Sequence, residues 1–402
     1  MHVLFLHTNF PAQFGQIALH LARDHGYRCT FVSEQPIADS PEIQHIHFQS
    51  AGGARAETHY CVRSFENQTW RSHAAYQALK ERPDIRPDLI VAHSGFVSSL
   101  FLRELYPDTP QIGYFEFFYH ARGSDMDFRF DLPPPSELDM LRMRSRNAQI
   151  LLDLDNCDAG YSPTNFQRAQ MPLEYQPKLR TIFDGIDTDF WKRDPAPARV
   201  YNGVPVPQGH QLVTYVSRGF ESIRGFDVFL QVADRICRHR QDVTVIVVGE
   251  DRIAYGGDAR FTDGKTFKDW AIDRYRPDLS RIHFIGRLPP TQLVQLLSLS
   301  DLHLYLTVPF VLSWSLMNAL SCGCTILASN TPPVREMIRT GENGMLVDFF
   351  DLEAWTSRSL AMLGGDTQCL EFGLRGGEMI RQHYTLQMAI EGIHMLFNDI
   401  LR

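Results

Sequence analysis

The chain has 402 residues, of which 44% are hydrophobic and 21% are charged, and its formal net charge is −8. This length predicts two or three domains, and the composition supplies enough apolar side chains for a core in each. The negative net charge argues against nucleic acid as the main partner, which would require a basic face. The sequence has no run of about 18 apolar residues, so we expect no transmembrane helix.

The N-terminal segment MHVLFLHTNF is apolar but short, with no basic region before it and no small-residue cleavage site after it. We interpret it as a first β-strand and not as a signal peptide. The seven cysteines have scattered spacings, which is typical of a reducing compartment. We therefore predict a cytoplasmic protein and leave peripheral contact with a membrane open.

The first half of the chain alternates short apolar runs with segments of helical periodicity. This pattern predicts strands at 2–8, 27–34, 88–94, 111–119, 159–164 and 178–186, and helices at 13–26, 64–81, 95–106 and 136–156. The chain between 34 and 64 is polar, and we interpret His45 and His47 there as solvated side chains and not as metal ligands.

The same alternation begins again after the Pro- and Gly-rich segment 187–209, which we predict to be the domain boundary. Strands are predicted at 211–217, 242–250, 281–286, 302–307, 324–329 and 344–349, with helices between them, notably at 225–240 and 289–300. Two such series predict an α/β protein with two doubly wound, Rossmann-like domains, in which ligands bind beyond the carboxyl ends of the strands. The irregular insertion 250–270 is long for a connection, which indicates a functional or mobile segment.

Two arginines lie in the stretch SRGFESIRGFD, directly after a predicted strand. Arg218 follows the strand, and Arg224 precedes a helix that begins near Gly225. Guanidinium groups bind phosphate oxygens through paired hydrogen bonds, and a helix N-terminus adds positive partial charge. The spacing suits a diphosphate clamp, although two surface arginines would give the same pattern.

The stretch PFVLSWSLMNAL offers a second candidate anion site, at the start of a predicted helix. Ser313, Trp314 and Ser315 form its first turn, where the backbone N–H groups have no partner within the helix. A phosphate group accepts hydrogen bonds from such amides. Simple N-capping by Ser313 is the alternative, and it uses the same geometry without a ligand.

Taken together, these stretches resemble the retaining glycosyltransferases of the GT-B fold, in family 4 of the nucleotide-sugar-dependent glycosyltransferases and in a bacterial subgroup. KLRTIFDGIDTDFW resembles the segment that closes the first domain of this family, and SRGFESIRGFD resembles its diphosphate element, with Arg224 where lysine is usual. RIHFIGRLPPTQLVQLLSLSDLHLYLT is similar to its nucleobase-side segment, and PFVLSWSLMNALSCGCTILASNTPPVRE to its sugar-nucleotide motif. The resemblance covers most of the chain and is clearest from Ser162 to Asp348.

This resemblance implies two Rossmann-like domains that face each other across a cleft. The N-terminal domain, 1–190, would bind the acceptor, the C-terminal domain, 191–385, would bind the nucleotide sugar, and a last helix, 386–402, would return to the N-terminal domain. The implied reaction moves a sugar from a UDP- or GDP-linked donor to a carbohydrate, lipid-linked or protein acceptor, with retention of the anomeric configuration, in bacterial polysaccharide or glycoconjugate biosynthesis. Neither a cofactor nor a metal is implied. The residues expected to bind the donor are Gly15, Arg218, Arg224, Gly286, Arg287, Ser313, Trp314, Ser315 and Asn318.

The sequence departs from the family at two glutamates eight positions apart, which are Phe310 and Asn318 here. In the family, the first usually contacts the donor sugar and the second the ribose. Phe310 accepts no hydrogen bond, so we expect the sugar to contact backbone amides of 311–315, whereas Asn318 still bonds a ribose hydroxyl but without charge. The alternative function is a catalytically weakened homologue that binds a nucleotide sugar and regulates another transferase.

In the N-terminal domain, the family places an acceptor-side residue at the end of a strand, and Glu116 and His120 are the candidates for this catalytic position. A carboxylate there takes a proton or stabilises positive charge on the sugar ring. Gly15, at the start of the first helix, would let a ligand approach the backbone, and His7 and Asn9 are acceptor-site candidates. The structural alternatives are an arginine partner for Glu116, a solvent-facing His120 and a packing role for His7.

Asp-x-Asp pairs occur at 125–127, 153–155 and 187–189. Transferases of a different fold use such a pair to hold a cation and a diphosphate. None of the three follows a clear strand of a nucleotide-binding half, so we interpret them as structural or solvated and predict no metal site.

Overall fold

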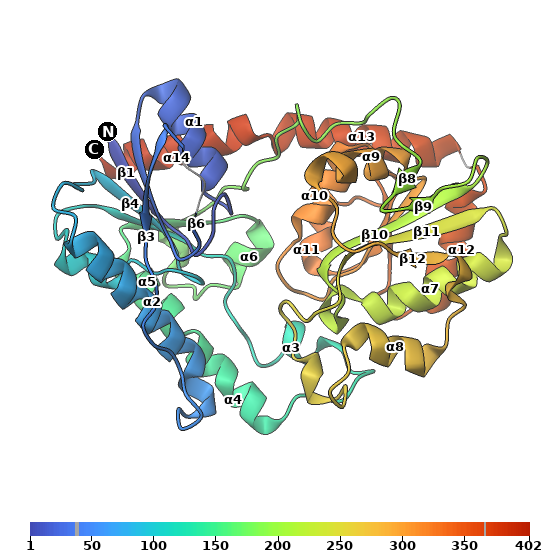
Figure 1. Cartoon of the computed structure of the whole chain (residues 1–402), viewed down its shortest axis with the longest axis horizontal. Helices are drawn as coiled ribbons and strands as arrows, with labels where there is room; N and C mark the ends of the chain where they lie inside the picture. Colours follow the sequence, from blue (N-terminus) through green and yellow to red (C-terminus); the bar gives the residue numbers. More distant parts are fainter. Residues whose placement is uncertain (37–39, 366) are drawn as a thin grey trace. The chain divides into compact units, whose positions relative to one another are not determined.

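The computed structural model describes residues 1–36, 40–365 and 367–402 (Figure 1). The chain forms two compact units. The first consists of Met1–Asp127, Pro135–Gly185 and Leu386–Arg402, and the second of Phe128–Pro134 and Ile186–Thr385. Each unit contains one parallel sheet with helices packed on it, so the predicted α/β class with two Rossmann-like domains is confirmed.

The sheet of the first unit has seven strands in the order β3-β2-β1-β4-β5-β6-β7, and neighbouring strands are parallel. Their bounds are β1 (His2–Leu6), β2 (Arg28–Ser33), β3 (Ile43–His47), β4 (Leu89–His93), β5 (Gln111–Tyr114), β6 (Ala159–Ser162) and β7 (Leu179–Thr181). The strand order reverses between β1 and β4, so the loops that follow these two strands lie side by side at the carboxyl edge of the sheet.

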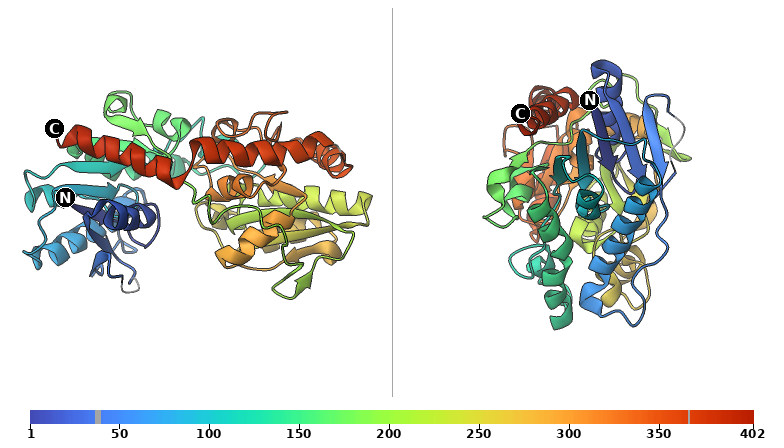
Figure 2. Two further views of the ribbon diagram at one scale, coloured as in Figure 1. Left: turned by 90° about the horizontal axis from the view of Figure 1, so that it is seen from above. Right: turned by 90° about the vertical axis from the view of Figure 1, so that its left-hand side faces the viewer.

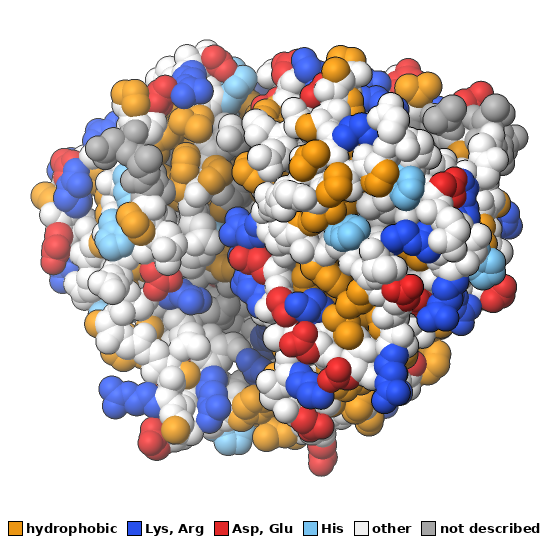
Figure 3. Space-filling view, turned by 45° about the vertical axis from the view of Figure 1, so that its right-hand side comes forward, with side chains coloured by type: hydrophobic (Ala, Val, Ile, Leu, Met, Phe, Trp, Pro, Cys, Tyr) orange, Lys and Arg blue, Asp and Glu red, His pale blue; other side chains and the backbone are white. Residues whose placement is uncertain are grey.

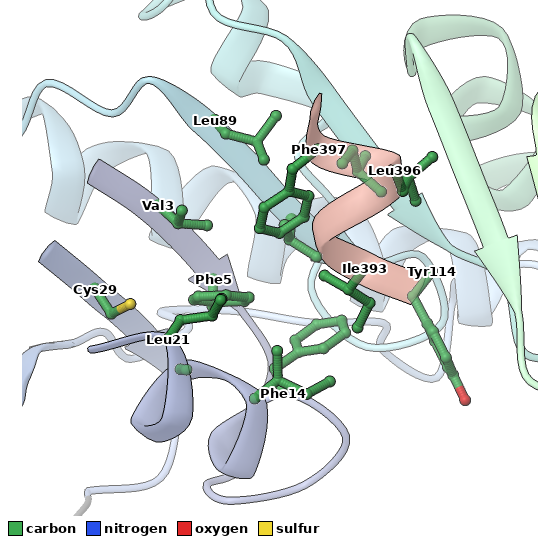
Figure 4. Close-up of a cluster of buried hydrophobic side chains, with 14 of the residues drawn as sticks. Val3, Phe5, Phe14, Leu21, Cys29, Leu89, Tyr114, Ile393, Leu396 and Phe397 are labelled. Atoms are coloured by element: carbon green, nitrogen blue, oxygen red, sulfur yellow. The ribbon is translucent and has the colours of Figure 1, made fainter. Parts of the chain in front are cut away.

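The helices of the first unit are α1 (Gly15–His25), α2 (Arg63–Lys80), α4 (Glu137–Arg146), α5 (Ala148–Asn156), α6 (Asn165–Ala169) and α14 (Leu386–Ile400), and a short helix α3 (Asp125–Phe128) ends where the chain enters the second unit. Helix α14, from the C-terminal end of the chain, packs beside α1 (Figure 1). Figure 4 shows side chains of α14 in the same buried cluster as side chains of β1, β2, β4 and α1. The C-terminal helix is therefore part of the first unit's core.

The sheet of the second unit has six parallel strands in the order β12-β11-β10-β13-β14-β15, and it reverses between β10 and β13. The strands are β10 (Gln211–Gly219), β11 (Val243–Glu250), β12 (Ile282–Phe284), β13 (Leu302–Tyr305), β14 (Ile326–Ser329) and β15 (Met345–Val347), and an antiparallel pair, β8 (Val200–Tyr201) and β9 (Val204–Pro205), precedes them. Seven of the eight residues of β11 are buried, as expected for a parallel strand covered on both faces.

The helices of the second unit are α7 (Phe226–His239), α8 (Phe267–Tyr275), α9 (Pro290–Leu299), α10 (Trp314–Ser321), α11 (Pro332–Arg335), α12 (Leu352–Leu363) and α13 (Thr367–His383). Helix α7 packs against α8 and α12, and α10 packs against α13 (Figure 2). Nine of the fourteen residues of α7 are buried, so this helix contributes strongly to the core.

The segment Phe128–Pro134 belongs to the second unit although the chain on both sides of it belongs to the first. Arg129 fixes it there, because its guanidinium makes a bidentate ion pair with the buried carboxylate of Asp227 in the first turn of α7, at 2.6 and 3.0 Å. The same guanidinium donates to the carbonyl of Ser222 at 2.8 Å. The predicted domain boundary at 190 placed this segment in the N-terminal domain.

Three local predictions are wrong. The predicted helix at 95–106 is only a 3₁₀ turn, Leu100–Glu104, because the Ser98 hydroxyl donates to the distant carboxylate of Asp153 while it accepts the Leu100 amide at 2.9 Å. The helix predicted at 136–156 is divided at Asn147, whose side chain bonds the backbone of Tyr119. The polar stretch after 34 contains strand β3.

His45 and His47 lie on this edge strand, where His45 is half-buried and His47 is exposed to solvent as predicted. His45 Nε2 is 2.8 Å from the Ser33 hydroxyl, and His47 Nε2 is 3.0 Å from the Glu34 carbonyl. Both interactions tie β3 to the end of β2.

On the face of the molecule seen in Figure 3, Lys and Arg side chains are interspersed with Asp and Glu side chains. Among the described residues, no helix combines the length and the apolar character needed to cross a bilayer.

Candidate functional site

In the second unit, the sequence-predicted donor residues gather where the strand order reverses, at the ends of β10 and β13. Arg224 is the central residue of this group. It ends a 3₁₀ turn, Ser222–Arg224, and only 6% of its surface is exposed. Its Nη1 donates to the Thr307 hydroxyl and to the Val311 carbonyl, each at 2.9 Å. Arg224 thus joins the loop after β10 to the segment that leads into α10.

Arg218 lies at the end of β10 and is exposed. Its Nη1 donates to the Tyr255 hydroxyl at 3.3 Å. The guanidinium carbons of Arg218 and Arg224 lie 5.9 and 5.5 Å from the centroid of the Tyr255 ring, so both cations contact the same aromatic side chain. The structure therefore brings the two predicted arginines together. Phe310 is buried beside them. Its ring centroid lies 5.9 Å from that of Tyr255 and 5.7 Å from the guanidinium carbon of Arg224.

The start of α10 is capped as the alternative interpretation predicted. The Ser313 hydroxyl accepts the Ser315 amide at 3.2 Å and lies 2.9 Å from the Ser315 hydroxyl, and the Ser313 amide donates to the Tyr305 hydroxyl at 3.0 Å. Trp314 is 41% exposed, and Asn318 follows it by one helical turn on the same face. The cap uses one of the amides of this turn, so a ligand role for the others stays a prediction.

Gly286 and Arg287 lie at the end of β12, farther along the same carboxyl edge. Gly286 has a φ of 70°, which favours glycine, and its carbonyl accepts the Gly249 amide at 3.0 Å. Arg287 is 3.8 Å from the carboxylate of Glu250 at the end of β11. The hydrogen bond from Arg252 and the nearby guanidinium groups, among them those of Arg287 and Arg218, lower the pKa of Glu250.

In the first unit, the reversal point between β1 and β4 holds two buried histidines. His7 follows β1 and His93 ends β4, and their ring centroids are 5.2 Å apart. Nδ1 of His7 lies 2.9 Å from the Asn9 amide and 3.1 Å from the Asn9 carbonyl, and Nδ1 of His93 accepts the Gly95 amide at 3.1 Å. In the neutral form of His93 the proton then lies on Nε2. Within the described chain, neither Nε2 has a hydrogen-bond partner.

Burial keeps both histidines neutral. Desolvation lowers the pKa of His7 to about 4, and it lowers the pKa of His93 well below its usual range, with a further contribution from His7. Both side chains therefore present an uncharged N–H donor at neutral pH.

The predicted catalytic residue Glu116 lies beside this pair, two residues beyond β5. Its side chain is 28% exposed, and its Oε2 is 3.9 Å from His93 Nε2. The Gln13 side-chain amide lies 3.5 Å from Oε1, and Gln167 donates to the Glu116 carbonyl at 2.6 Å. His93 was not among the predicted site residues, although it ends the strand that pairs with β1, where ligands of such sheets bind.

His120 and Gly15 have local partners. His120 Nε2 lies 3.2 Å from the Gln170 carbonyl. The Gly15 amide donates to the Pro11 carbonyl at 2.6 Å, and a Cβ on Gly15 would lie 2.5 Å from the Cβ of Pro11. Close packing with Pro11 thus explains this glycine, and a ligand role for either residue stays a prediction.

Asp153, from one of the Asp-x-Asp pairs, is buried. Its carboxylate accepts hydrogen bonds from the hydroxyls of Ser94, at 2.6 Å, and Ser98, and from the Gln149 amide at 2.9 Å. Desolvation raises its pKa to about 6. This residue joins α5 to the loop after β4, which agrees with a structural role.

Two curated relatives share part of the chain. N-acetyl-alpha-D-glucosaminyl L-malate synthase from Bacillus anthracis is 20% identical over 225 residues, which are 56% of this chain and 54% of the relative. D-inositol 3-phosphate glycosyltransferase from Corynebacterium jeikeium is 23% identical over 231 residues, or 55% of this chain and 52% of the relative. The match thus spans about half the length of these relatives.

Solved structures match over the whole chain. Sucrose-phosphate synthase from Thermosynechococcus elongatus has a TM-score of 0.75 with 17% identity and covers 100% of this chain and 99% of its own. HepE from Anabaena, in complex with UDP-glucose, has a TM-score of 0.69 with 14% identity and covers 99% of this chain and 100% of its own. At these identities the likeness establishes the fold, which is that of GT-B glycosyltransferases.

Two family profiles match successive parts of the chain. The profile described as glycosyl transferase family 4 group matches residues 25–191, and the profile described as glycosyl transferases group 1 matches residues 202–373. Residues 25–191 are thus similar to the glycosyl transferase family 4 group, and residues 202–373 to the glycosyl transferases group 1.

Proposed function

We propose that this protein is a glycosyltransferase that takes a sugar from a nucleoside diphosphate sugar, and that its second unit binds this donor. The observation that carries the proposal is the cationic arrangement at the reversal point of the second sheet. Arg218 and Arg224 contact one ring, and Arg224 is hydrogen-bonded to the segment that leads into α10. Guanidinium groups and helix amides both donate to phosphate oxygens, so a diphosphate suits this site. The HepE complex with UDP-glucose supports the same class of donor.

The other donor contacts follow from the neighbouring elements. We propose that Asn318 binds a ribose hydroxyl, that the backbone at Gly286 and Arg287 meets the base, and that UDP or GDP is the nucleotide. Phe310 offers the sugar an apolar surface in place of a carboxylate, so the amides of 311–315 would supply the hydrogen bonds.

We further propose that transfer retains the anomeric configuration. An oxygen of the leaving diphosphate takes the proton of the acceptor hydroxyl as that hydroxyl bonds the anomeric carbon, and both events occur on the same face of the sugar. The protein then orients the reactants and stabilises negative charge on the departing diphosphate. Arg218, Arg224 and the first amides of α10 would supply this stabilisation.

For the first unit we propose a hydroxyl-bearing acceptor, such as a carbohydrate on a lipid or protein carrier. The imidazoles of His7 and His93 are neutral and each carries one N–H donor, and Glu116 is an acceptor beside them. Neutral donors next to a carboxylate suit a hydroxyl better than an anion. Glu116 is the proposed catalytic carboxylate, and His120 is the second candidate. We place the enzyme in the cytoplasm, in polysaccharide or glycoconjugate biosynthesis, and the scattered spacing of its seven cysteines fits that compartment.

The direct test incubates the purified protein with a panel of UDP- and GDP-linked sugars, with and without acceptor glycans, and measures release of the nucleoside diphosphate. NMR of the anomeric proton in donor and product then decides whether configuration is retained. We expect one donor to be bound and turned over. Tight binding of a nucleotide sugar without turnover on any acceptor would favour the regulatory homologue, and no binding of any nucleotide would refute the proposal.

A further inference from the structure

A tyrosine from the insertion 250–270 occupies the centre of the candidate donor site. The Tyr255 ring lies within 6 Å of the guanidinium groups of Arg218 and Arg224, and its hydroxyl accepts a hydrogen bond from Arg218. The side chain is 40% exposed, so part of it faces solvent beside the two cations. The sequence predicted a functional or mobile role for this insertion without naming a residue.

The insertion is held in place by two buried carboxylates. Oε2 of Glu221 accepts the amides of Ala254, Tyr255 and Gly256 at 3.1, 2.9 and 2.8 Å. Asp258 accepts the Ser222 amide at 2.8 Å and the Ser222 hydroxyl at 2.5 Å. Glu221 is fully buried and Asp258 is 1% exposed.

These bonds connect the insertion to the short turn that carries Arg224. Glu221 and Ser222 precede Arg224 by three and two residues, so the position of Tyr255 is set from the same turn that positions this guanidinium. Desolvation raises the pKa of Glu221, and the hydrogen bonds from Gly256 and Tyr255 oppose that rise. Anchoring the insertion therefore requires a buried carboxylate, and burial disfavours its charged form. Such an anchor is unusual for a loop that has no function.

The chemistry of the ring explains what such an anchor achieves. Two guanidinium groups repel each other, and the face of an aromatic ring attracts each of them. A hydroxyl that accepts one hydrogen bond still has a proton to donate to a second partner. Tyr255 can therefore hold Arg218 and Arg224 near each other and donate to a phosphate oxygen that the two cations attract.

We propose that Tyr255 is a donor-binding residue that makes the site selective for a nucleoside diphosphate over a monophosphate. A diphosphate is long enough to contact both guanidinium groups and the Tyr255 hydroxyl between them. A single phosphate group would contact fewer of these three side chains. This inference rests on the proposed function and adds a specificity-determining residue to it.

The test measures the affinities of the wild type, Tyr255→Phe and Tyr255→Ala for UDP, GDP, UMP and GMP by calorimetry. Tyr255→Ala should lose about 5- to 30-fold in affinity for the diphosphate that the wild type prefers, since it loses both the ring and the hydroxyl. Tyr255→Phe keeps the ring and should lose about threefold. Affinity for the matching monophosphate should change by less than about twofold.

Tyr275→Phe is the matched control, because the Tyr275 ring also packs on an arginine, 5.7 Å from the guanidinium carbon of Arg274, but on α8. It should bind as the wild type does. A second measurement places Tyr255→Ala in an Arg218→Ala background. There Tyr255→Ala should lower the affinity for the diphosphate by a smaller factor than it does in the wild type.

Three results would overturn the inference. Unchanged diphosphate affinity in Tyr255→Ala would show that the ring does not contact the ligand. If Tyr255→Ala lost affinity for the diphosphate and the monophosphate by the same factor, the ring would contact the nucleoside and not the phosphates. A wild type that binds none of the four nucleotides would refute the proposed function and this inference together, whereas the first two results leave the proposed function intact.

Discussion

The two sheets reverse strand order in the same way, but the residues at the two reversal points differ in charge and burial. In the first unit His7 directly follows β1 and His93 is the last residue of β4; both are buried and neutral, with Glu116 beside them. In the second unit Arg218 lies at the end of β10, Arg224 lies in the loop that follows it, and the loop after β13 leads into α10. The same topology therefore places ligand-binding loops at equivalent edges, and the side chains decide which chemistry each edge accepts.

This difference has a simple electrostatic origin. Burial disfavours the charged form of an imidazole, so the two histidines are neutral donors at neutral pH. A guanidinium stays charged in either environment. The first site therefore suits a neutral hydroxyl compound, as proposed for the acceptor. The second site suits an anion, as proposed for the donor.

The sharpest way to separate the two sites is Glu116→Gln. If Glu116 takes part in the chemistry, turnover should fall by about 10²- to 10⁴-fold, the range for loss of an acid–base group. Nucleotide affinity should not change, because the arginines proposed to bind the diphosphate, Arg218 and Arg224, lie in the second unit. Steady-state rates and calorimetry on the same preparation give both values. A Glu116→Gln protein with wild-type turnover would remove the carboxylate from the mechanism.

The neutrality of the first site predicts a pH dependence of stability. The pKa of His7 falls from 6.5 in the unfolded chain to about 4 in the folded protein, so the unfolded state binds the proton first as pH falls. Stability is complete above pH 6.5 and decreases as pH falls towards 4, by about 3 kcal/mol from His7 alone.

Urea unfolding followed by circular dichroism between pH 4 and 7.5 measures this decrease. His7→Gln should reduce the slope, and His73→Gln, an exposed histidine on α2, should not. Equal slopes in wild type and His7→Gln would show that His7 titrates normally.

At the second site, Arg224→Ala should weaken binding of the nucleoside diphosphate by about 1.5–3 kcal/mol, the value for a lost charged hydrogen bond. Because Arg224 also supports the segment before α10, Arg224→Lys is needed to keep a positive charge at that position. Lysine should recover part of the affinity but not the paired hydrogen bonds. Arg235→Ala, on the exposed side of α7, is the control. Unchanged calorimetric affinity in both Arg224 variants would refute the clamp.

Local sequence patterns predicted most of the fold because they reflect local physics. The continuous apolar run of β11 and the helical period of α7, which begins after Gly225, are visible in short windows. The prediction of a helix at 95–106 was wrong because the Ser98 hydroxyl donates to the carboxylate of Asp153, 55 residues away. A short sequence window does not contain such a partner.

The same limit applies to the candidate site. Arg218 and Arg224 could be predicted because they are near neighbours in sequence and flank a strand and a helix. Tyr255 is 37 residues from Arg218, and Arg129 is 98 residues from Asp227, so both contacts depend on how the chain folds back. Residues that a loop or a crossing segment brings to a site are therefore the ones that sequence spacing misses.

The smallest effect is expected at the margin of the second site, where Arg287→Ala tests how far the cationic region extends. The Arg287 side chain is 77% exposed and lies 3.8 Å from Glu250, a geometry that contributes little to stability or binding. If only the backbone at Gly286 and Arg287 meets the base, diphosphate affinity should fall by less than about threefold, and the preference between UDP and GDP should stay the same. A loss as large as that of Arg224→Ala would show that the phosphates lie nearer to β12 than to β13. The contrast between the two sheets would then remain, but the donor would lie on the other side of β10.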